Sequence, residues 1–390
     1  MGLFDFLKKK KVQANTSINQ TTDKNKAGKA EAHVQMSIQM PSSDDVVPVE
    51  KRVKSAFPSK KGKLYPHEIL VLDYADTFYT EGNTYQRFWW TRYGVKNVDA
   101  VLQGLLKRGF IEVAPITATL EKKTVADLKQ VLEGHGLDSK GKKAILIQRI
   151  IDEIPSAELN KLFPTRLYMR TTLGEAELKA EEYVSYIHRH SIEELDIWSL
   201  NKLVYGSLSY LPYRDVIWRY LNQRSMEHFS AHDFGLYRNC RFSMATFLGE
   251  EGKVKSELET LAEVVFFDLT GAGNNYNPEY LYIIASHFFP YEHSLARTAP
   301  GIIKRIFDCQ EKLQLTDEAL RDVLSNRMKE LTAPIQLFEI SECVDIIFYE
   351  HSEDKETLDK VYKLAEKRFH KKHPNLKQNP FHSERQDNFK

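Results

Sequence analysis

The chain has little cysteine. Its 390 residues include three, Cys240, Cys309 and Cys343, which lie far apart and are odd in number. No C-x-x-C pair is present, so neither a disulfide framework nor a sequence-defined zinc site is expected. We therefore predict a protein of the reducing cytoplasm that carries no metal or other cofactor.

Long apolar runs are also absent, and none approaches the roughly 20 residues that span a bilayer. The N-terminal stretch "MGLFDFLKKKK" places its lysines after a very short apolar piece, the reverse of a signal peptide. It has two interpretations, a membrane-surface contact through its apolar side chains or a frayed terminus. We favour the frayed terminus, and a membrane is not an expected partner.

A net charge of one sign is missing too, because 55 Lys and Arg nearly balance 54 Asp and Glu. Any nucleic-acid function must therefore depend on where the charge lies. Residues 1–65 hold 13 Lys or Arg against 6 Asp or Glu, and the stretch is poor in aromatics. We predict a basic disordered segment at 1–63 and a disordered polar tail at 374–390.

Residues 64–118 follow a helix, helix, helix, glycine, strand order. Pro66 suits a first helical turn, Asn97 a helix N-cap, Gly109 a helix stop, and "FIEV" a strand. This order resembles a winged-helix domain, whose reading helix would be 98–108. That helix either contacts DNA directly or serves only for packing. Its polar candidates for DNA contact are Arg92, Lys96, Asn97, Gln103, Lys107 and Arg108.

The aromatic piece "RFWWTRY" at 87–93 also has two interpretations. Aromatic rings flanked by arginines can stack on unpaired bases. Phe88, Trp89 and Trp90 are more often core residues, and we predict that they are core here.

Residues 124–154 predict two short helices around a glycine-containing loop. Thr124 and Asp127 can cap the first helix, which ends near Gly134 and Gly136. An apolar stripe follows and stops at Pro155. Because two short helices make a small core, we expect this unit to pack against a neighbouring element.

The loop of this unit concentrates positive charge at a helix start. Lys140, Lys142, Lys143 and Arg149 surround Gly141, without a carboxylate between 139 and 149. Lysines oppose the helix dipole at this end, where a structural helix would favour Asp or Glu. Backbone N–H groups and nearby cations together form a phosphate-binding locus, so we predict nucleic-acid contact here.

The stretch "TVADLKQVLEGHGLDSKGKKAILIQRIID" resembles a SAP motif, a two-helix nucleic-acid-binding module that we place at 119–155, with the motif itself at about 122–154. The resemblance implies binding to DNA, most often duplex, and in some members to RNA. Residues at the family's characteristic places are Leu128, Lys129, Leu132, Gly136, Leu137, Gly141, Lys142, Lys143, Leu146, Ile147 and Arg149.

Residues 156–373 are almost entirely of helical pattern. The stretch 237–271 predicts a helix, a turn at Gly252 and a second helix, and it resembles tetratricopeptide-like repeats, although Glu257 stands where such repeats place a small residue. The sequence thus predicts a mainly α protein: a winged helix, a SAP module and a helical, solenoid-like domain. This order resembles the Fanconi-associated nucleases, but their Asp and Glu-x-Lys nuclease motif has no match.

Other enzyme signals are weak: "GAGNN" at 271–275 follows a helix and predicts a turn, and the histidines form no metal-ligand pattern. We predict a noncatalytic DNA-binding protein of bacterial or phage type whose helical domain binds a protein partner. Three alternatives stay open: a structure-specific nucleic-acid-processing enzyme with an unrecognised site, an RNA-binding protein, and a protein scaffold whose SAP-like unit only packs.

Overall fold

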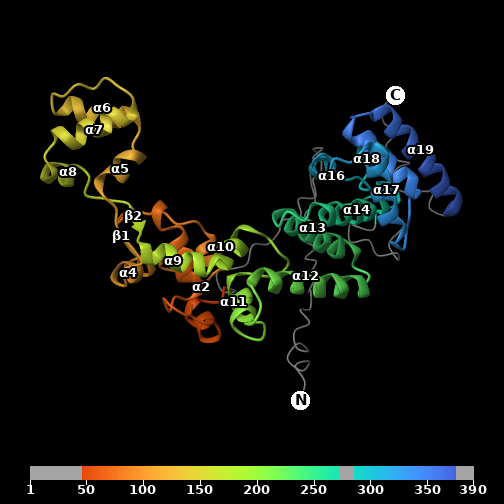
Figure 1. The fold of residues 1–390 in the computed structure, drawn as a ribbon, viewed down its shortest axis with the longest axis horizontal. Coiled ribbons are helices and arrows are strands. Elements are labelled where there is room, and N and C mark those ends of the chain that lie inside the picture. The colour runs from red at the N-terminus through yellow and green to blue at the C-terminus, as the bar shows by residue number, and fades with distance from the viewer. Residues whose placement is uncertain (1–45, 272–284, 375–390) are drawn as a thin grey trace, which may run out of the picture. The chain divides into compact units, whose positions relative to one another are not determined.

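The computed structural model describes residues 46–271 and 285–374, and these are mainly helical, which confirms the predicted fold class (Figure 1). None of the helices in these ranges is both long and apolar enough to cross a bilayer. The predictions for residues 1–45, for most of "GAGNN" and for the tail from 375 onward lie outside the described residues.

The first helices begin and end where the sequence places them. Pro66 is the first residue of its helix, and Asn97 Oδ1 accepts a hydrogen bond from Ala100 N at 2.9 Å. Gly109 follows the end of the helix at 98–107 and has a φ of 75°. The elements are α1 Val49–Arg52, η2 Val53–Ser55, α2 Pro66–Asp73, η3 Ala75–Thr77, α3 Phe88–Thr91 and α4 Val98–Lys107.

Residues 46–63, which composition places in the disordered segment, are ordered in the structure. Val49 N donates to Gly94 O at 2.9 Å. The amide of Asn201 accepts from Phe57 N at 2.8 Å and donates to Phe57 O at 2.9 Å. These hydrogen bonds to residues distant in sequence hold the segment in place, although its composition offers few apolar side chains to drive folding.

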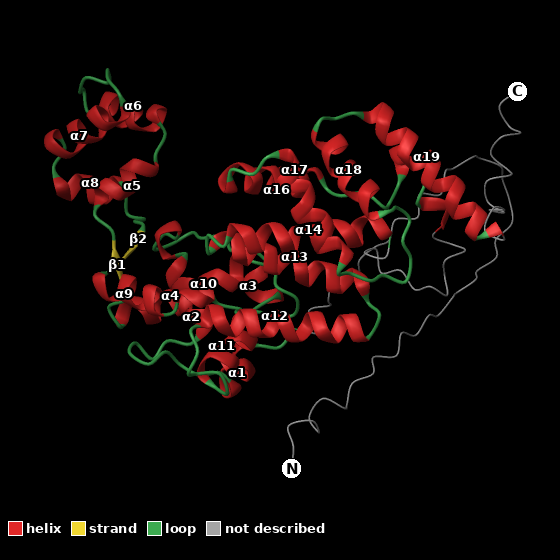
Figure 2. Ribbon diagram, turned by 45° about the vertical axis from the view of Figure 1, so that its right-hand side comes forward, coloured by secondary structure: helices red, strands yellow, loops and turns green. Residues whose placement is uncertain are grey.

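Two short antiparallel strands, β1 Ile111–Val113 and β2 Tyr168–Arg170, form a sheet (yellow in Figure 2). Ile111 pairs with Arg170 and Val113 with Tyr168, while Tyr79 adds an isolated bridge to Leu167. Four helices lie between the strands in the chain. These helices, the α5–α8 module, are α5 Ile116–Lys122, α6 Val125–Gly134, α7 Lys143–Glu153 and α8 Ser156–Leu162.

The α5–α8 module has its own small core. The buried side chains come from all four helices, so α5 and α8 extend the core that α6 and α7 alone would form. This is the packing that a two-helix unit requires. The buried members are Leu120, Leu128, Leu132, Leu146, Ile150, Ile154 and Leu159.

A second core combines residues from both sides of the module in the sequence. Its buried members come from 64–111 and from 168–247, so the segments before β1 and after β2 fold together. The helices that follow β2 are α9 Thr172–Ala180, α10 Glu182–Arg189, α11 Ile197–Tyr205 and α12 Tyr213–Ser230.

The third core lies between residues 234 and 369 and belongs to the C-terminal helices. The predicted pair is confirmed: α13 Phe234–Glu250 and α14 Val254–Thr270 are joined at Gly252, whose φ is 69°. The remaining elements are η6 Ala285–His287, η7 Tyr291–His293, α16 Pro300–Leu313, α17 Asp317–Lys329, α18 Ile340–His351 and α19 Lys355–Lys372.

Glu257 is accommodated inside this core by its neighbours. Its side chain is 7% exposed and pairs with the guanidinium of Arg305. Gly249 faces it across the helix pair, and a Cβ there would lie 2.6 Å from Glu257 Oε2. Gly249 therefore leaves room for the larger side chain of Glu257, and Arg305 neutralises its charge.

Candidate nucleic-acid interface

The predicted cap of α6 is confirmed. Thr124 Oγ1 accepts a hydrogen bond from Asp127 N at 3.2 Å, and Asp127 Oδ2 accepts from Thr124 N at 3.0 Å. Hydrogen bonding of its carboxylate by the side chain and the backbone N–H of Thr124 lowers the pKa of Asp127. The start of α6 is thus satisfied by its own residues, in contrast to the start of α7.

Helix α7 begins without a side-chain cap. Lys142 is its N-cap residue and forms no capping hydrogen bond through its side chain, and the first turn contains no acidic residue. The first N–H groups of a helix lack intrahelical partners and carry a partial positive charge. An anion is the complement of such a helix end.

The lysines at this helix end differ in their exposure. Lys140 and Lys142 are exposed, whereas Lys143 is half-buried and donates from Nζ to Glu121 O at 2.7 Å. That bond ties the start of α7 to the end of α5. Lys140 and Lys142 therefore offer their ammonium groups to solvent, and Lys143 is partly committed to the module itself.

Gly141 can be no other residue without strain. Its φ of 135° lies in a region that favours glycine, and an added Cβ would come within 3.2 Å of Ile145 Cγ2. The glycine brings the backbone of the loop close to α7. The absence of a side chain also leaves the loop backbone accessible between the two exposed lysines.

Arg149 holds the loop in place from within α7. Its Nη1 donates to Lys140 O at 3.0 Å and also to Asp138 O, and Nη2 lies 3.6 Å from Asp138 Oδ2. Its side chain is only 19% exposed. Arg149, which the sequence predicts to bind phosphate, thus lies where it organises the loop that carries the lysines.

The candidates in and just before α4 form a separate group, on the segment whose apolar side chains pack in the second core. Asn97 caps α4, Gln103 Nε2 donates to Tyr168 Oη at 2.9 Å, and Arg108 bonds to Glu68 Oε1 at 2.9 Å. Two lysines of the group are exposed, Lys96 beside the Trp90 ring and Lys107 in the last turn.

Aromatic side chains of the stretch at 87–93 pack in the second core, and this packing positions Arg92. The Arg92 guanidinium lies 5.4 Å from the centre of the Tyr93 ring. Trp89 is buried, which confirms the core interpretation for this residue, whereas Phe88 and Trp90 are half-buried. Tyr93 is buried as well. His188 bonds through both ring nitrogens, to Tyr74 Oη at 2.8 Å and to Tyr93 Oη at 2.7 Å, and burial lowers its pKa.

Sequence reasoning missed two exposed apolar side chains in the first turns of α7 and α6. Ile145, in the first turn of α7, is 51% exposed, and Val125, in the first turn of α6, is 40% exposed. Neither contributes to the module core. The signal for Ile145 is present in the sequence, because it falls outside the apolar stripe of α7. Exposed apolar groups next to cations suit contact with sugars and base edges.

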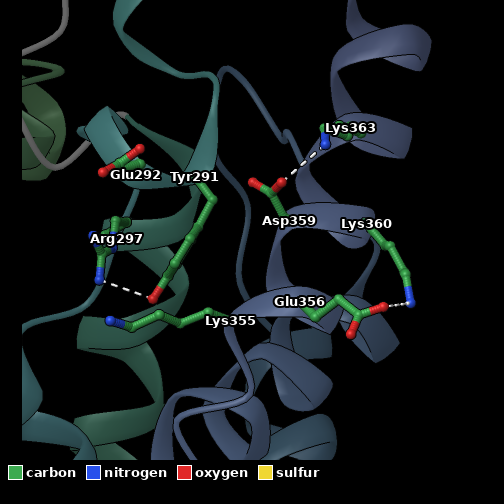
Figure 3. Close-up of a pocket in the computed structure, with 8 residues that line it drawn as sticks. All are labelled: Tyr291, Glu292, Arg297, Lys355, Glu356, Asp359, Lys360 and Lys363. Carbon is green, nitrogen blue, oxygen red and sulfur yellow. Dashed lines mark hydrogen bonds and ion pairs between the residues drawn. The ribbon is translucent and has the colours of Figure 1, made fainter.

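A hollow of about 560 Å³ is lined by residues of η7 and α19 and by Arg297. Figure 3 shows that two of its lysines pair with carboxylates of the same helix: Lys360 bonds to Glu356 at 2.6 Å and Lys363 to Asp359 at 2.9 Å. Arg297 donates to Tyr291 Oη at 2.9 Å. These groups are committed to partners within the chain, so this hollow gives no argument for a ligand.

Comparison with known families places the basic loop in a recognised domain. Residues 119–154 match the model of the SAP domain, so the resemblance expected from the sequence is confirmed for this segment. No curated protein and no solved structure matches the chain. The SAP domain indicates that the protein binds nucleic acid.

Proposed function

We propose that this chain is a noncatalytic protein that binds duplex DNA through the loop at 138–143 of its SAP domain. The observation that carries the proposal is the uncapped start of α7 with exposed Lys140 and Lys142 beside it. The ammonium groups neutralise phosphates, and the first N–H groups of α7 donate to phosphate oxygens across Gly141.

Arg149 and Lys143 act mainly through the loop in this scheme. Arg149 fixes the carbonyl groups of Asp138 and Lys140, and Lys143 fastens α7 to α5. Ile145 and Val125 supply apolar contacts at the edge of the same surface. The site thus consists of two exposed cations, a helix end and two apolar side chains.

The SAP domain needs a second contact surface. A few phosphate contacts hold DNA at roughly 10⁻⁴ to 10⁻⁶ M at physiological salt. We propose that α4 and the residues just before it supply this surface, through Lys107 and Lys96 in particular. The residues with committed partners, Arg92, Asn97, Gln103 and Arg108, would position α4.

A winged-helix interpretation is supported by the order α2, Tyr79 bridge, α3, α4, β1, β2. In a winged helix the two strands after the reading helix carry the wing between them. Here the connection between β1 and β2 is the α5–α8 module. We propose that the SAP domain occupies the place of the wing, which would join both DNA-contacting elements to one small sheet.

The C-terminal helices are proposed to bind a protein partner in the manner of tetratricopeptide-like helix pairs. Support comes from the α13–α14 pair, in which five of the six residues near the packing positions of such repeats are buried and the sixth, Gly252, lies exposed in the turn. The five are Met244, Ala245, Leu248, Leu261 and Val264.

The experiment is a binding series with the full chain against duplex DNA, single-stranded DNA, branched DNA and RNA at several salt concentrations. We expect duplex or branched DNA to bind most tightly. Replacing Lys140 and Lys142 with alanine is expected to weaken duplex binding and to lower the slope of log affinity against log salt by about two. Fluorescence anisotropy gives both quantities.

The matched control replaces two exposed lysines of the C-terminal helices, Lys255 and Lys304, with alanine. It removes the same charge and should leave the slope within about 0.5 of the parent value. Equal slopes for the parent and the Lys140/Lys142 variant would refute the proposed interface. Preferential binding of RNA by the parent chain would replace DNA as the ligand.

A further inference from the structure

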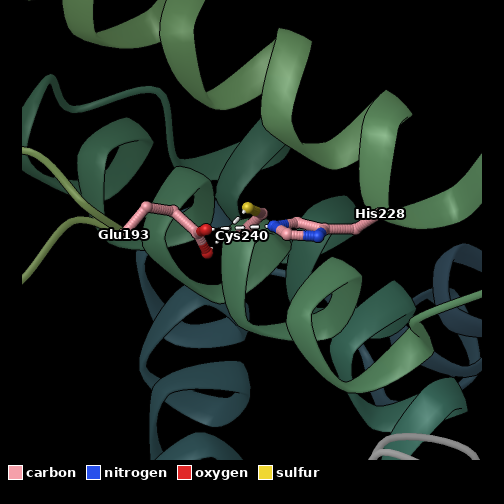
Figure 4. A group of neighbouring side chains, drawn as sticks. All are labelled: Glu193, His228 and Cys240. Atoms are coloured by element: carbon pink, nitrogen blue, oxygen red, sulfur yellow. Dashed lines mark hydrogen bonds and ion pairs between the residues drawn. The ribbon is translucent and has the colours of Figure 1, made fainter. Parts of the chain in front are cut away.

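We propose that Glu193, His228 and Cys240 form a binding site for one zinc-type divalent metal ion. Figure 4 shows the three side chains converging from three parts of the second core. Glu193 lies in the connection between α10 and α11, His228 near the end of α12, and Cys240 within α13. This site is distinct from the proposed DNA-binding loop.

The donor atoms have nearly the spacing that a tetrahedral ion requires. His228 Nε2 lies 3.0 Å from Glu193 Oε2, Cys240 Sγ lies 3.1 Å from Glu193 Oε1, and all three donors lie within 4.8 Å of one another. Bond lengths of about 2.0 to 2.3 Å at tetrahedral angles give ligand separations of roughly 3.2 to 3.6 Å. Shifts of a few tenths of an ångström would bring the two separations from Glu193 into this range, and the third pair, Cys240 Sγ and His228 Nε2, lies within 4.8 Å.

The chemistry of the three donors favours zinc. A thiolate, an imidazole nitrogen and a carboxylate oxygen are the ligand types that zinc takes, and three protein ligands leave a fourth position for water. Hard oxygen-seeking ions such as magnesium do not take a sulfur ligand. No short sequence motif marks this set, because its members are 35 and 12 residues apart.

The site is buried, which makes uncompensated charge costly there. The side chains of Glu193 and His228 are 9% and 8% exposed, and Cys240 is fully buried. Arg224 Nη2 lies 3.6 Å from Glu193 Oε2 and is the cation beside this carboxylate, while its own Nε is buried without a hydrogen-bond partner. Glu193 also adopts a left-handed backbone with a φ of 47°. This backbone conformation is sparsely populated by residues other than glycine, and it occurs here at one of the three converging side chains.

Metal binding exchanges one proton for the ion. In the metal-free chain the thiol of Cys240 and the Nε2–H of His228 can both donate to Glu193. When the ion binds, the Cys240 thiol proton leaves to solvent, and the His228 proton resides on Nδ1 so that the Nε2 lone pair faces the metal. The ion then fastens the α10–α11 connection to α12 and α13.

Cobalt(II) is the probe for this site, because a cobalt–thiolate bond gives a charge-transfer band in the near ultraviolet. The full chain, treated with chelator and then titrated with cobalt, is expected to develop this band at one ion per chain. Cys240→Ser should abolish it. Cys309→Ser and Cys343→Ser remove other buried cysteines and should keep the band.

Two further variants keep the test decisive if Cys240→Ser unfolds. Glu193→Gln and His228→Gln, checked for folding by circular dichroism, should each weaken cobalt binding at least about tenfold, and zinc should displace cobalt from the parent chain. A parent chain without the band, or a band that survives in Cys240→Ser, overturns the proposal. The three side chains are then a hydrogen-bonded group without metal.

Discussion

Arg149 Nη1 donates a hydrogen bond to Lys140 O at 3.0 Å, so a residue on the second turn of α7 controls the backbone of the loop that precedes the helix. The same guanidinium contacts Asp138. The positive charge of Arg149 is therefore directed at protein carbonyl groups, and its contribution to DNA binding is expected to be indirect.

Arg149→Ala should separate loop positioning from phosphate contact. We expect duplex affinity to fall about tenfold at low salt while the slope against log salt changes by less than about 0.5, since few counterions depend on this residue. Lys142→Ala, the comparison, should lower the slope by about one. A slope loss of about one for Arg149→Ala would mean that it contacts a phosphate directly.

Gly141→Ala should destabilise the SAP domain and weaken DNA binding. The alanine must hold a φ of 135° with its Cβ 3.2 Å from Ile145, which is expected to cost about 1 to 3 kcal/mol. Gly134→Ala is the control, because a Cβ at Gly134 meets nothing within 4 Å. Hydrogen exchange of α6 and α7 measures the difference, and equal protection in both variants would contradict it.

Glu263→Ala should strongly destabilise the C-terminal core. The carboxylate is 2% exposed and accepts hydrogen bonds from Arg241 at 2.7 Å and Arg327 at 3.0 Å. Its removal leaves two guanidinium groups without their buried partner and is expected to cost about 3 kcal/mol. Glu259→Ala, on the exposed side of the same helix, should cost less than about 0.5 kcal/mol in urea denaturation.

His67 should make the protein less stable in mild acid. Burial lowers the pKa of His67 to about 4, from 6.5 for an exposed histidine. Between these values the unfolded chain binds a proton that the folded chain does not, so stability falls as the pH drops from 6.5 to 4, by about 3 kcal/mol from this residue.

The test compares urea denaturation of the parent chain and His67→Phe at pH 7 and pH 4.5. The phenylalanine keeps the aromatic stack on Trp198, whose ring centre lies 5.5 Å away, and removes the proton site. The variant should lose less stability over this interval than the parent chain. His293→Phe, at an exposed position, should behave like the parent.

Local rules predicted much of the fold. The caps at Thr124 and Asn97, the proline at the start of α2 and the glycine between α13 and α14 each act over a few residues, and the structure has all of them. The buried face of α4 follows the apolar spacing, and so does that of α6 at Leu128 and Leu132, whereas Val125 is exposed. Such signals are contained in a single segment, so they can be recognised without knowledge of the tertiary contacts.

Contacts between segments that are distant in sequence could not be predicted from these local patterns. Strand β2 is three residues long and is separated from β1 by 54 residues, and nothing in "YMR" identifies Ile111 as its partner. The order of residues 46–63 depends in the same way on Asn201, which is distant in sequence. Likewise, the role of Arg149 became visible only when the carbonyl groups that it contacts were known.

The pairing of β1 with β2 gives the SAP domain two covalent attachments that lie side by side. Ala114 N donates to Leu167 O at 2.8 Å, so the chain leaves the sheet and returns to it at one point. A segment with adjacent ends can be exchanged for another domain, or shortened to a tight hairpin turn, without changing the strands that carry it. The nucleic-acid module is therefore an insertion between β1 and β2 that can be exchanged while the two-stranded sheet stays unchanged.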